Sequence, residues 1–217
     1  MAGHIQQSLI EQLKPVISEE RLGTYLTAAG FDVDRALKLY VWNALIGEAF
    51  HLPIQAVEVG LRNRIGFAFA ETFGPEWWKD DQFLTMLDDE RRADLQLVRQ
   101  RIRNRKLSPI TGQIVAGLSF GFWVGMLHKR YNPLLWSKQL RPAFPSLPLD
   151  RSRASLAVMS GRVATLRNRI WHHEPIIKRD LSAEYGAVMT LLQWISPEKA
   201  AWLRPYCRVP QLLRQKP

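Results

Sequence analysis

The sequence predicts an all-α protein that folds as a single compact helical bundle. Apolar residues recur three and four positions apart over long windows, which is the periodicity of amphipathic and buried helices. No series of alternating, strand-like segments is present. The chain has 217 residues, of which 47% are hydrophobic and 23% charged. It is therefore long enough to bury a core, and its composition excludes disorder and fibrous repeats.

Capping residues and glycines predict two helices in the N-terminal part of the chain. Ser18 suits the N-cap of a short helix that ends at Gly30, because its hydroxyl can accept a hydrogen bond from a backbone N–H. Asp32 or Asp34 can cap the long helix that follows, and Gly74 with the proline after it ends that helix. The long helix is expected to carry the N-terminal core.

The most membrane-like stretch, residues 114–127, is predicted to be a buried helix. It is shorter than the roughly 20 apolar residues that a membrane span needs. Gly117, Gly121 and Gly125 have the small-xxx-small spacing that lets helix backbones approach closely. We therefore expect a glycine-grooved core helix and no membrane partner.

Two further helices are predicted after a proline-rich connector. Residues 131–148 contain four prolines and form a connector with at most one short helix. A long helix covers about 152–173, and Pro175 ends it because the residue before a proline disfavours the α conformation. Residues 180–195 form one more helix, and residues 196–217 a basic C-terminal extension. Since the late helices form only a pair, one domain is favoured over two.

The charge points to a polyanionic partner. The net charge is +10 and the isoelectric point near 10.1, which predicts attraction to nucleic acid. The densest basic segment lies on a predicted helix from Asp88 to about Lys106, and residues 91–106 include only one acid, Asp94. A charged run is usually a solvated face, whereas the lack of compensating acids favours phosphate contact; both interpretations stay open. The residues assigned to RNA contact here are Arg99 and Arg103.

The single cysteine, Cys207, excludes an internal disulfide and a thiolate zinc cluster. A reducing, cytoplasmic location is therefore expected. Residues 1–14 mix polar with apolar residues and lack an apolar h-region, so no secretory signal is expected.

Adjacent histidines, His172 and His173, end the predicted long helix. Neighbouring helical residues point about 100° apart, so the two rings are poorly placed to chelate one ion. No other His or Cys lies three or four positions away to complete a pair. Neither a metal ion nor another cofactor is expected.

The same helix end suits metal-free phosphate chemistry. Asn168 and His172 are four residues apart on one face, so the amide can orient the imidazole. Arg167 can bind a phosphate through two hydrogen bonds. His172 is expected in the last helical turn, where the helix dipole favours its protonated form. A proton-transferring imidazole beside a fixed cation is the minimum for cleaving RNA, because the substrate's 2′-hydroxyl is the nucleophile.

The pattern Arg-Asn-x-x-x-His at residues 167–172 resembles the Arg-x4–6-His signature of HEPN domains. The wider chain resembles the Abi-like (abortive-infection) family of that group, over about residues 22–195. The blocks that carry the resemblance are residues 40–43, 58–63, 118–123 and 167–175. It implies an all-α HEPN domain over residues 1–217, metal-independent endoribonuclease activity, a homodimer that brings two motifs into one cleft, and a role in phage defence or a toxin–antitoxin system.

Carried over to this sequence, the resemblance makes Arg167 and His172 the catalytic pair and Asn168 the polar residue that follows the arginine. Substrate contact or orientation of His172 is expected of the residues beside this motif, which are Arg169, Trp171, His173 and Glu174.

Two further features of the sequence fit either a structural or a functional role. Glu58 and Arg62 are four residues apart and can form an ion pair, for which a structural clamp is favoured over a contribution to the cleft. The eight tryptophans are expected to be mostly core residues. Trp171 is the best candidate for stacking on an unpaired base, because it lies beside the motif.

Two other functions fit the same residues. A non-catalytic RNA-binding partner in a regulatory ribonucleoprotein would use the same arginine-rich site without turnover. A toxin silenced by an antitoxin protein or a small RNA would also fit the residues.

Overall fold

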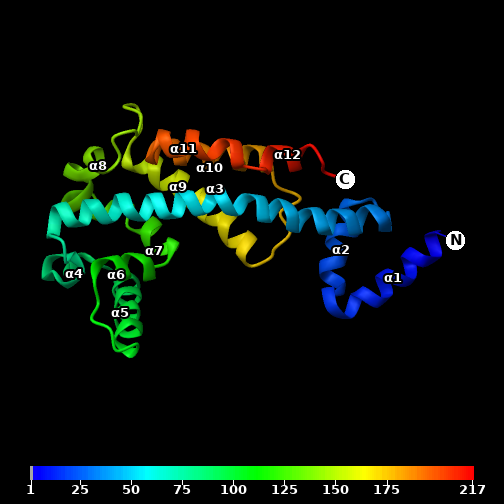
Figure 1. Ribbon diagram of the computed structural model, residues 1–217, viewed down its shortest axis with the longest axis horizontal. Helices are drawn as coiled ribbons and strands as arrows, with labels where there is room; N and C mark the ends of the chain where they lie inside the picture. The colour runs from blue at the N-terminus through cyan, green and yellow to red at the C-terminus, as the bar shows by residue number, and fades with distance from the viewer. Residues whose placement is uncertain (1) are drawn as a thin grey trace. The chain divides into compact units, whose positions relative to one another are not determined.

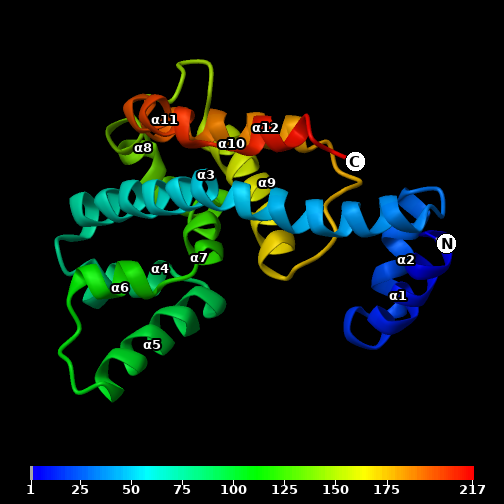
Figure 2. The same cartoon turned by 45° about the vertical axis from the view of Figure 1, so that its right-hand side comes forward.

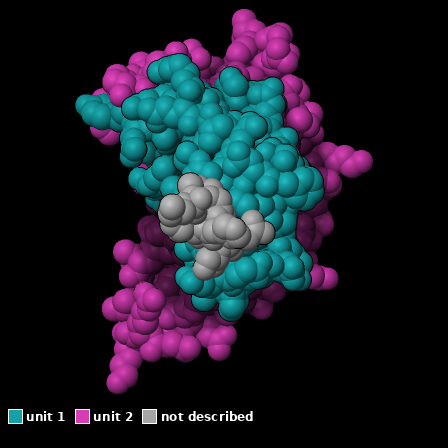
Figure 3. Space-filling view, turned by 90° about the vertical axis from the view of Figure 1, so that its right-hand side faces the viewer, with its two compact units in different colours: residues 1–52, 166–186, 206–217 teal, residues 53–165, 187–205 magenta. Residues whose placement is uncertain are grey.

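The computed structural model describes the backbone of residues 2–217 and the side chains of residues 9–217. Residues 2–217 contain helices and short helical turns and no β-strand, which confirms the predicted all-α class. Figure 1 labels the helices. The chain divides into two compact units, each built from segments that are far apart in the sequence (Figure 3).

Unit 1 comprises residues 1–52, 166–186 and 206–217. Three long helices, α3, α9 and α10, contribute only part of their length to it. The helices represented in unit 1 are α1 (Ala2–Ile17), α2 (Glu19–Ala28), α3 (Val33–Phe73), α9 (Arg153–Trp171), α10 (Leu181–Ile195) and α12 (Val209–Leu213).

The predicted caps and stops of the N-terminal helices are confirmed. Ser18 Oγ accepts a hydrogen bond from the Arg21 N–H at 3.3 Å and begins α2. Asp32 Oδ1 accepts from the Arg35 N–H at 2.9 Å at the start of α3. Gly74, with φ of 86°, follows the last residue of α3, because a left-handed conformation is accessible to glycine at little cost.

The core of unit 1 includes residues from the C-terminal end of the chain. Trp42 and Phe50 of α3 are almost fully buried. The Trp42 indole N–H donates to the Leu212 carbonyl at 2.8 Å, and Val209 and Leu212 are themselves buried. Part of the expected basic extension therefore contributes apolar side chains to this core.

Unit 2 comprises residues 53–165 and 187–205. The remaining parts of α3, α9 and α10 belong to it, together with several short helices and helical turns. Its short helices are α4 (Asp81–Met86), α5 (Asp89–Asn104), α6 (Thr111–Gly117), α7 (Phe120–Gly125), α8 (Ser137–Ala143) and α11 (Pro197–Leu203).

An aromatic cluster forms much of the core of unit 2. The Phe69 ring lies 4.8 Å from Trp77, 4.9 Å from Phe83 and 5.8 Å from Trp123, measured between ring centroids. Trp77, Trp78 and Trp123 are each at most 1% exposed, so they are core residues, as expected for most of the tryptophans.

The prediction of one helix over residues 114–127 is wrong. The segment forms α6 and α7, and Ser119 between them accepts a hydrogen bond from the Phe122 N–H at 3.1 Å as the N-cap of α7. This local side-chain cap satisfies a helix-end donor and favours a new start over continuation.

Glycines of α6 and α7 do permit close packing, as the sequence predicts. A Cβ at Gly117 would lie 2.7 Å from Val98 Cγ1 of α5, and one at Gly125 would overlap the Arg91 guanidinium. Figure 2 shows α5 and α6 side by side. The glycine groove therefore receives side chains of α5.

Other helix boundaries differ slightly from the prediction. The long helix α9 ends at Trp171 rather than near residue 173. The connector contains α8, preceded by a 3₁₀ turn at Lys129–Tyr131 and a π-helical turn at Asn132–Trp136. The predicted helix from residue 88 is α5, which Asp88 caps.

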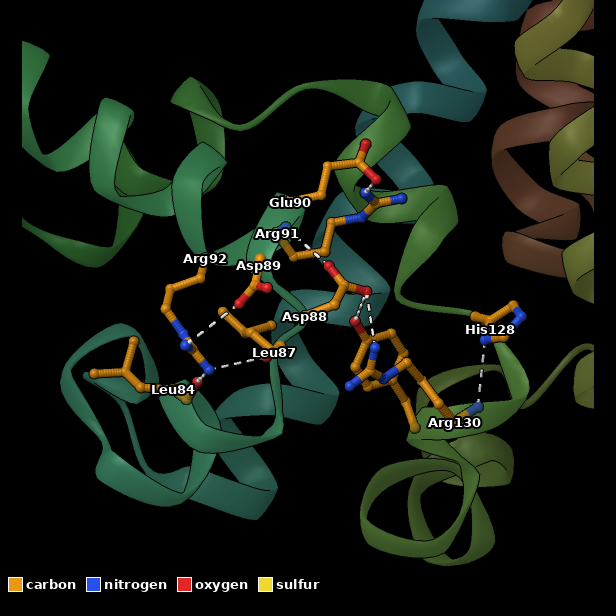
Figure 4. A network of polar contacts seen from close by, with 10 residues as sticks. Leu84, Leu87, Asp88, Asp89, Glu90, Arg91, Arg92, His128 and Arg130 are labelled. Carbon is orange, nitrogen blue, oxygen red and sulfur yellow. Dashed lines mark hydrogen bonds and ion pairs between the residues drawn. The ribbon is translucent and has the colours of Figure 1, made fainter.

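Asp88 joins the start of α5 to the segment that follows α7. Its Oδ1 accepts from the Arg91 N–H at 2.9 Å, and its Oδ2 accepts from the Tyr131 hydroxyl at 2.9 Å and from Arg130 Nη1 at 3.4 Å (Figure 4). Burial raises the pKa of Asp88, but these hydrogen bonds and the neighbouring arginine charges bring it below its usual value. Burial and the bond to Asp88 raise the pKa of Tyr131 to about 12.

Candidate functional site

The candidate site lies in unit 1, where α9 ends and the chain turns. The Glu174 N–H donates to the Arg169 carbonyl at 2.8 Å, and the His173 N–H donates to the Ile170 carbonyl at 3.0 Å. His173 has φ of 56°. These two bonds and the left-handed residue make a Schellman motif. His172 is thus the C-cap of α9, one residue beyond its last helical residue.

Contacts from α2 and α3 hold the turn after α9 in place. The buried Asn43 of α3 accepts a hydrogen bond from the Ile176 N–H through Oδ1 at 2.8 Å. Arg21 of α2 donates from Nη2 to the His173 carbonyl. The turn is therefore anchored by residues that precede it by more than a hundred positions.

The three residues predicted to be catalytic lie together at this helix end. Asn168 and His172 are exposed and Arg167 is half-buried. Arg167 Nη1 donates to Asn168 Oδ1 at 3.4 Å, and the Arg167 guanidinium carbon lies 4.8 Å from the centroid of the Trp171 ring. The last turn of α9 and its C-cap thus carry a cation, an amide and an imidazole, of which the cation and the amide are in contact.

The expected orientation of His172 by the Asn168 side chain differs from what the structure contains. The Asn168 side chain is engaged by Arg167, and the contact between residues 168 and 172 is the backbone bond from the His172 N–H to the Asn168 carbonyl, at 2.9 Å. The backbone bond keeps His172 one helical turn beyond Asn168, but the Asn168 amide oxygen accepts from Arg167 instead of contacting the imidazole.

A pocket of about 470 Å³ opens beside this helix end, entirely within unit 1. Residues of α2, α3, α9 and the turn after α9 line it. Trp171, His173 and Glu174 line the pocket, whereas Arg167, Asn168 and His172 are outside its lining. The polar side chains that line it are Arg21, Asn43, Glu48, His51, His173 and Glu174.

Aromatic rings form part of the pocket wall. The His51 ring stacks on Trp171 with a centroid distance of 5.1 Å and an interplanar angle of 20°. Tyr40 also lines the pocket, and the Arg21 guanidinium lies 5.8 Å from its ring centroid. Flat π surfaces and cations of this kind bind planar ligands.

Two carboxylates of the pocket form ion pairs at its edge. Glu174 lies 3.5 Å from Arg169, and Glu48 lies 3.5 Å from Arg208. All four side chains are between 42% and 66% exposed, so these pairs are weak and exchange readily with water or a ligand.

The remaining predicted residues belong to unit 2, so the site in unit 1 is built without them. Arg99 lies 5.5 Å from the centroid of the buried Trp78 ring, while Arg103 is exposed. The Arg62 Nε atom is buried and has no hydrogen-bond partner in the described structure. The ion pair between Glu58 and Arg62 stays a prediction.

Four of the polar residues that line the pocket were not among the predicted site residues, namely Arg21, Asn43, Glu48 and His51. A signal for two of them was present, because Glu48 and His51 continue the three- and four-residue spacing that begins at Tyr40 on α3. Arg21 reaches the site through a tertiary contact, for which the sequence pattern offers no signal.

Among residues 2–217, no helix combines the length and the hydropathy that a membrane span requires. Among residues 9–217, whose side chains the structure describes, no cluster of three or more His, Cys, Asp or Glu side chains is arranged to hold a metal ion. Comparison with protein-family models, curated proteins and solved structures found no match for this chain. Fold and site together define an all-α protein with a basic, histidine-bearing helix end beside an aromatic pocket.

Proposed function

We propose that this protein is a metal-independent endoribonuclease of HEPN type that cuts RNA at the C-terminal end of α9. The observation that carries the proposal is the presence of Arg167 and the exposed His172 at one helix end, next to a pocket with aromatic walls. A phosphodiester needs a cation and a proton-transferring group, and an unpaired nucleotide needs a surface on which to stack.

In the proposed reaction the substrate's 2′-oxygen attacks the adjacent phosphorus and the bond to the 5′-oxygen breaks. One base accepts the proton of the 2′-hydroxyl and one acid returns a proton to the leaving 5′-oxygen. The products are a 2′,3′-cyclic phosphate and a 5′-hydroxyl. Arg167 stabilises the charge on the phosphoryl oxygens. His172 transfers one proton, and in a homodimer the partner's His172 transfers the other.

The residues beside the motif have supporting roles in this proposal. His173 and Glu174 line the pocket, which supports substrate contact rather than primary proton transfer. The net charge of +10 supports RNA as the partner, since phosphate contacts supply much of nucleic-acid affinity. By its resemblance to Abi-like proteins, the nuclease would act in phage defence or as a toxin controlled by an antitoxin protein or a small RNA.

The test is cleavage of labelled RNA by the purified protein in EDTA. The wild type should yield fragments with 2′,3′-cyclic phosphate ends, and His172→Ala should lower the cleavage rate by about 100-fold or more. His128→Ala, which removes an exposed histidine of unit 2, is the matched control and should leave the rate unchanged. Equal cleavage by His172→Ala and wild type would contradict the mechanism.

A non-catalytic RNA-binding function is the second candidate. The observation that favours it is the engagement of the Asn168 side chain by Arg167, which leaves the His172 ring without the expected orienting amide. This function would show as RNA binding that weakens with salt, with no cleavage products under any of the conditions above.

A further inference from the structure

We infer that the pocket beside α9 binds one unpaired nucleobase that carries an amino group, namely adenine, cytosine or guanine, in preference to uracil. The inference deepens the proposed function, on which it rests for RNA as the source of the base. It concerns residues outside the predicted catalytic set, chiefly Glu48, His51 and Trp171.

The size of the pocket and its walls fit a flat, mostly apolar group. Its volume of about 470 Å³ lies in the range of about 300–1,000 Å³ typical of small-molecule sites, and it has room for one nucleoside. The His51 ring, which stacks on Trp171, supplies a planar surface, and Ile170 and Ile176 supply apolar lining. Bases stack on such rings irrespective of sequence, so stacking alone explains binding but not preference.

The charges of the pocket argue against a phosphate inside it. Two carboxylates, Glu48 and Glu174, line it against one arginine, Arg21, which uses one of its five N–H donors to hold the His173 carbonyl. A phosphate would meet like charges there, so the backbone of the RNA is expected outside, toward Arg167. Trp171 connects the two regions, because it lines the pocket and contacts the Arg167 guanidinium.

The same carboxylates provide the preference among bases. Carboxylate oxygens only accept hydrogen bonds, and the amino groups of adenine, cytosine and guanine donate them. Uracil lacks an exocyclic amino group, and its one donor on this edge, N3–H, lies between two carbonyl oxygens that would face the carboxylates unfavourably. Glu48 and Glu174 are available for this contact because their present ion pairs with Arg208 and Arg169 are solvent-exposed and weak.

The test measures binding without cleavage. Short, fluorescently labelled 2′-deoxy homopolymers of adenine, cytosine and uracil lack the attacking hydroxyl, and fluorescence anisotropy gives their affinities. Adenine and cytosine oligomers should bind about ten-fold more tightly than the uracil oligomer. Trp171→Ala should weaken binding of the adenine oligomer by about ten-fold or more. Trp202→Ala, which removes a tryptophan that is 64% exposed in unit 2, is the matched control.

A second variant separates preference from folding. Glu48→Gln combined with Glu174→Gln changes two exposed side chains without changing their size, and circular dichroism checks that the fold is kept. Because each new amide can donate to a carbonyl, the double variant should bind the uracil oligomer more tightly and the adenine oligomer less tightly. An unchanged ratio of the two affinities would overturn the role of the carboxylates.

The remaining outcomes distinguish this inference from the proposed nuclease. Equal binding of all three homopolymers, with no loss in Trp171→Ala, would overturn the pocket assignment even where RNA is still cut. Base preference without any cleavage of RNA would support the pocket and count against the nuclease. Free AMP that binds as tightly as the adenine oligomer would show that the pocket serves a free nucleotide, and would overturn its assignment to RNA.

Discussion

Asn43 shows how a single buried side chain positions the candidate site. Its carboxamide oxygen binds the Ile176 N–H in the turn after α9, although 133 residues separate the two positions. A buried backbone N–H that loses its acceptor cannot form a hydrogen bond to water in its place. The placement of His173 and Glu174 at the pocket therefore depends on a residue of α3.

Replacing Asn43 by Ala should lower the free energy of unfolding by about 1–3 kcal/mol, because the Ile176 N–H loses its acceptor. Urea denaturation measures the change. Asn63→Ala, at an exposed position of the same helix, should change the free energy by less than about 0.5 kcal/mol. Similar effects of the two substitutions would contradict the anchoring role.

The short helices of unit 2 depend on glycines whose roles differ by position. Gly117 at the end of α6 faces Val98 of α5, whereas a Cβ at Gly112, near the start of α6, meets nothing within 4 Å. Gly117→Ala should lower the free energy of unfolding by about 1–3 kcal/mol, because the branched Val98 side chain cannot rotate away easily. Gly112→Ala should instead raise it by about 0.4–1 kcal/mol. Denaturant unfolding of both variants measures these changes. Stabilisation by Gly117→Ala would show that α5 and α6 are not packed this closely.

The hydrogen bond from Tyr131 to Asp88, at the start of α5, makes the free energy of unfolding change with pH in the alkaline range. The pKa of Tyr131 is raised from 10.0 to about 12 in the folded protein, so the folded state keeps a proton that the unfolded state releases in this range. The contribution of Tyr131 to the free energy of unfolding is complete below pH 10 and is lost as the pH rises toward 12. Chemical denaturation across this range should show a smaller decline for Tyr131→Phe than for the wild type. The exposed Tyr206→Phe serves as control and should follow the wild type.

At acid pH, the Asp88 carboxylate of the same hydrogen bond makes stability depend on pH in the opposite direction. The pKa of Asp88 lies below its usual value of 3.8. The contribution of Asp88 to the free energy of unfolding is therefore present above that value and is lost as the pH falls through the lowered pKa. Tyr131→Phe removes one hydrogen bond to the carboxylate and should therefore also weaken stability at neutral pH, by about 1–2 kcal/mol.

For the whole molecule, the net charge of +10 predicts RNA binding that is sensitive to salt. Affinity for a single-stranded RNA should fall with a log–log slope of about −0.7 for each phosphate contact. Arg103→Ala, which removes an exposed arginine of α5 that is predicted to contact a phosphate, should make the slope shallower by about 0.7. Arg151→Ala, which removes an arginine paired with Asp150 at 3.3 Å, is the control and should leave the slope unchanged. Anisotropy titrations at several salt concentrations measure the slope, and a salt-independent affinity would contradict the phosphate contacts.

Local sequence signals account for the helical class, for the approximate bounds of α2, α3, α5, α9 and α10, and for the grouping of Arg167, Asn168 and His172. These features are local, since caps, glycines and prolines act within a few residues. The helix break at Ser119 was missed because a single N-cap overrides a continuous apolar pattern. The single domain, the HEPN type and the nuclease activity stay predictions.

Which side chains surround the site depends on tertiary packing. Arg21 and Asn43 contact the turn at His173 and Ile176 across separations of 152 and 133 residues. Tertiary packing also placed Trp171 against His51 and made His172 the cap of α9 rather than one of its helical residues. Periodicity indicates the face on which a residue lies, whereas the partner of that face depends on the packing of distant segments.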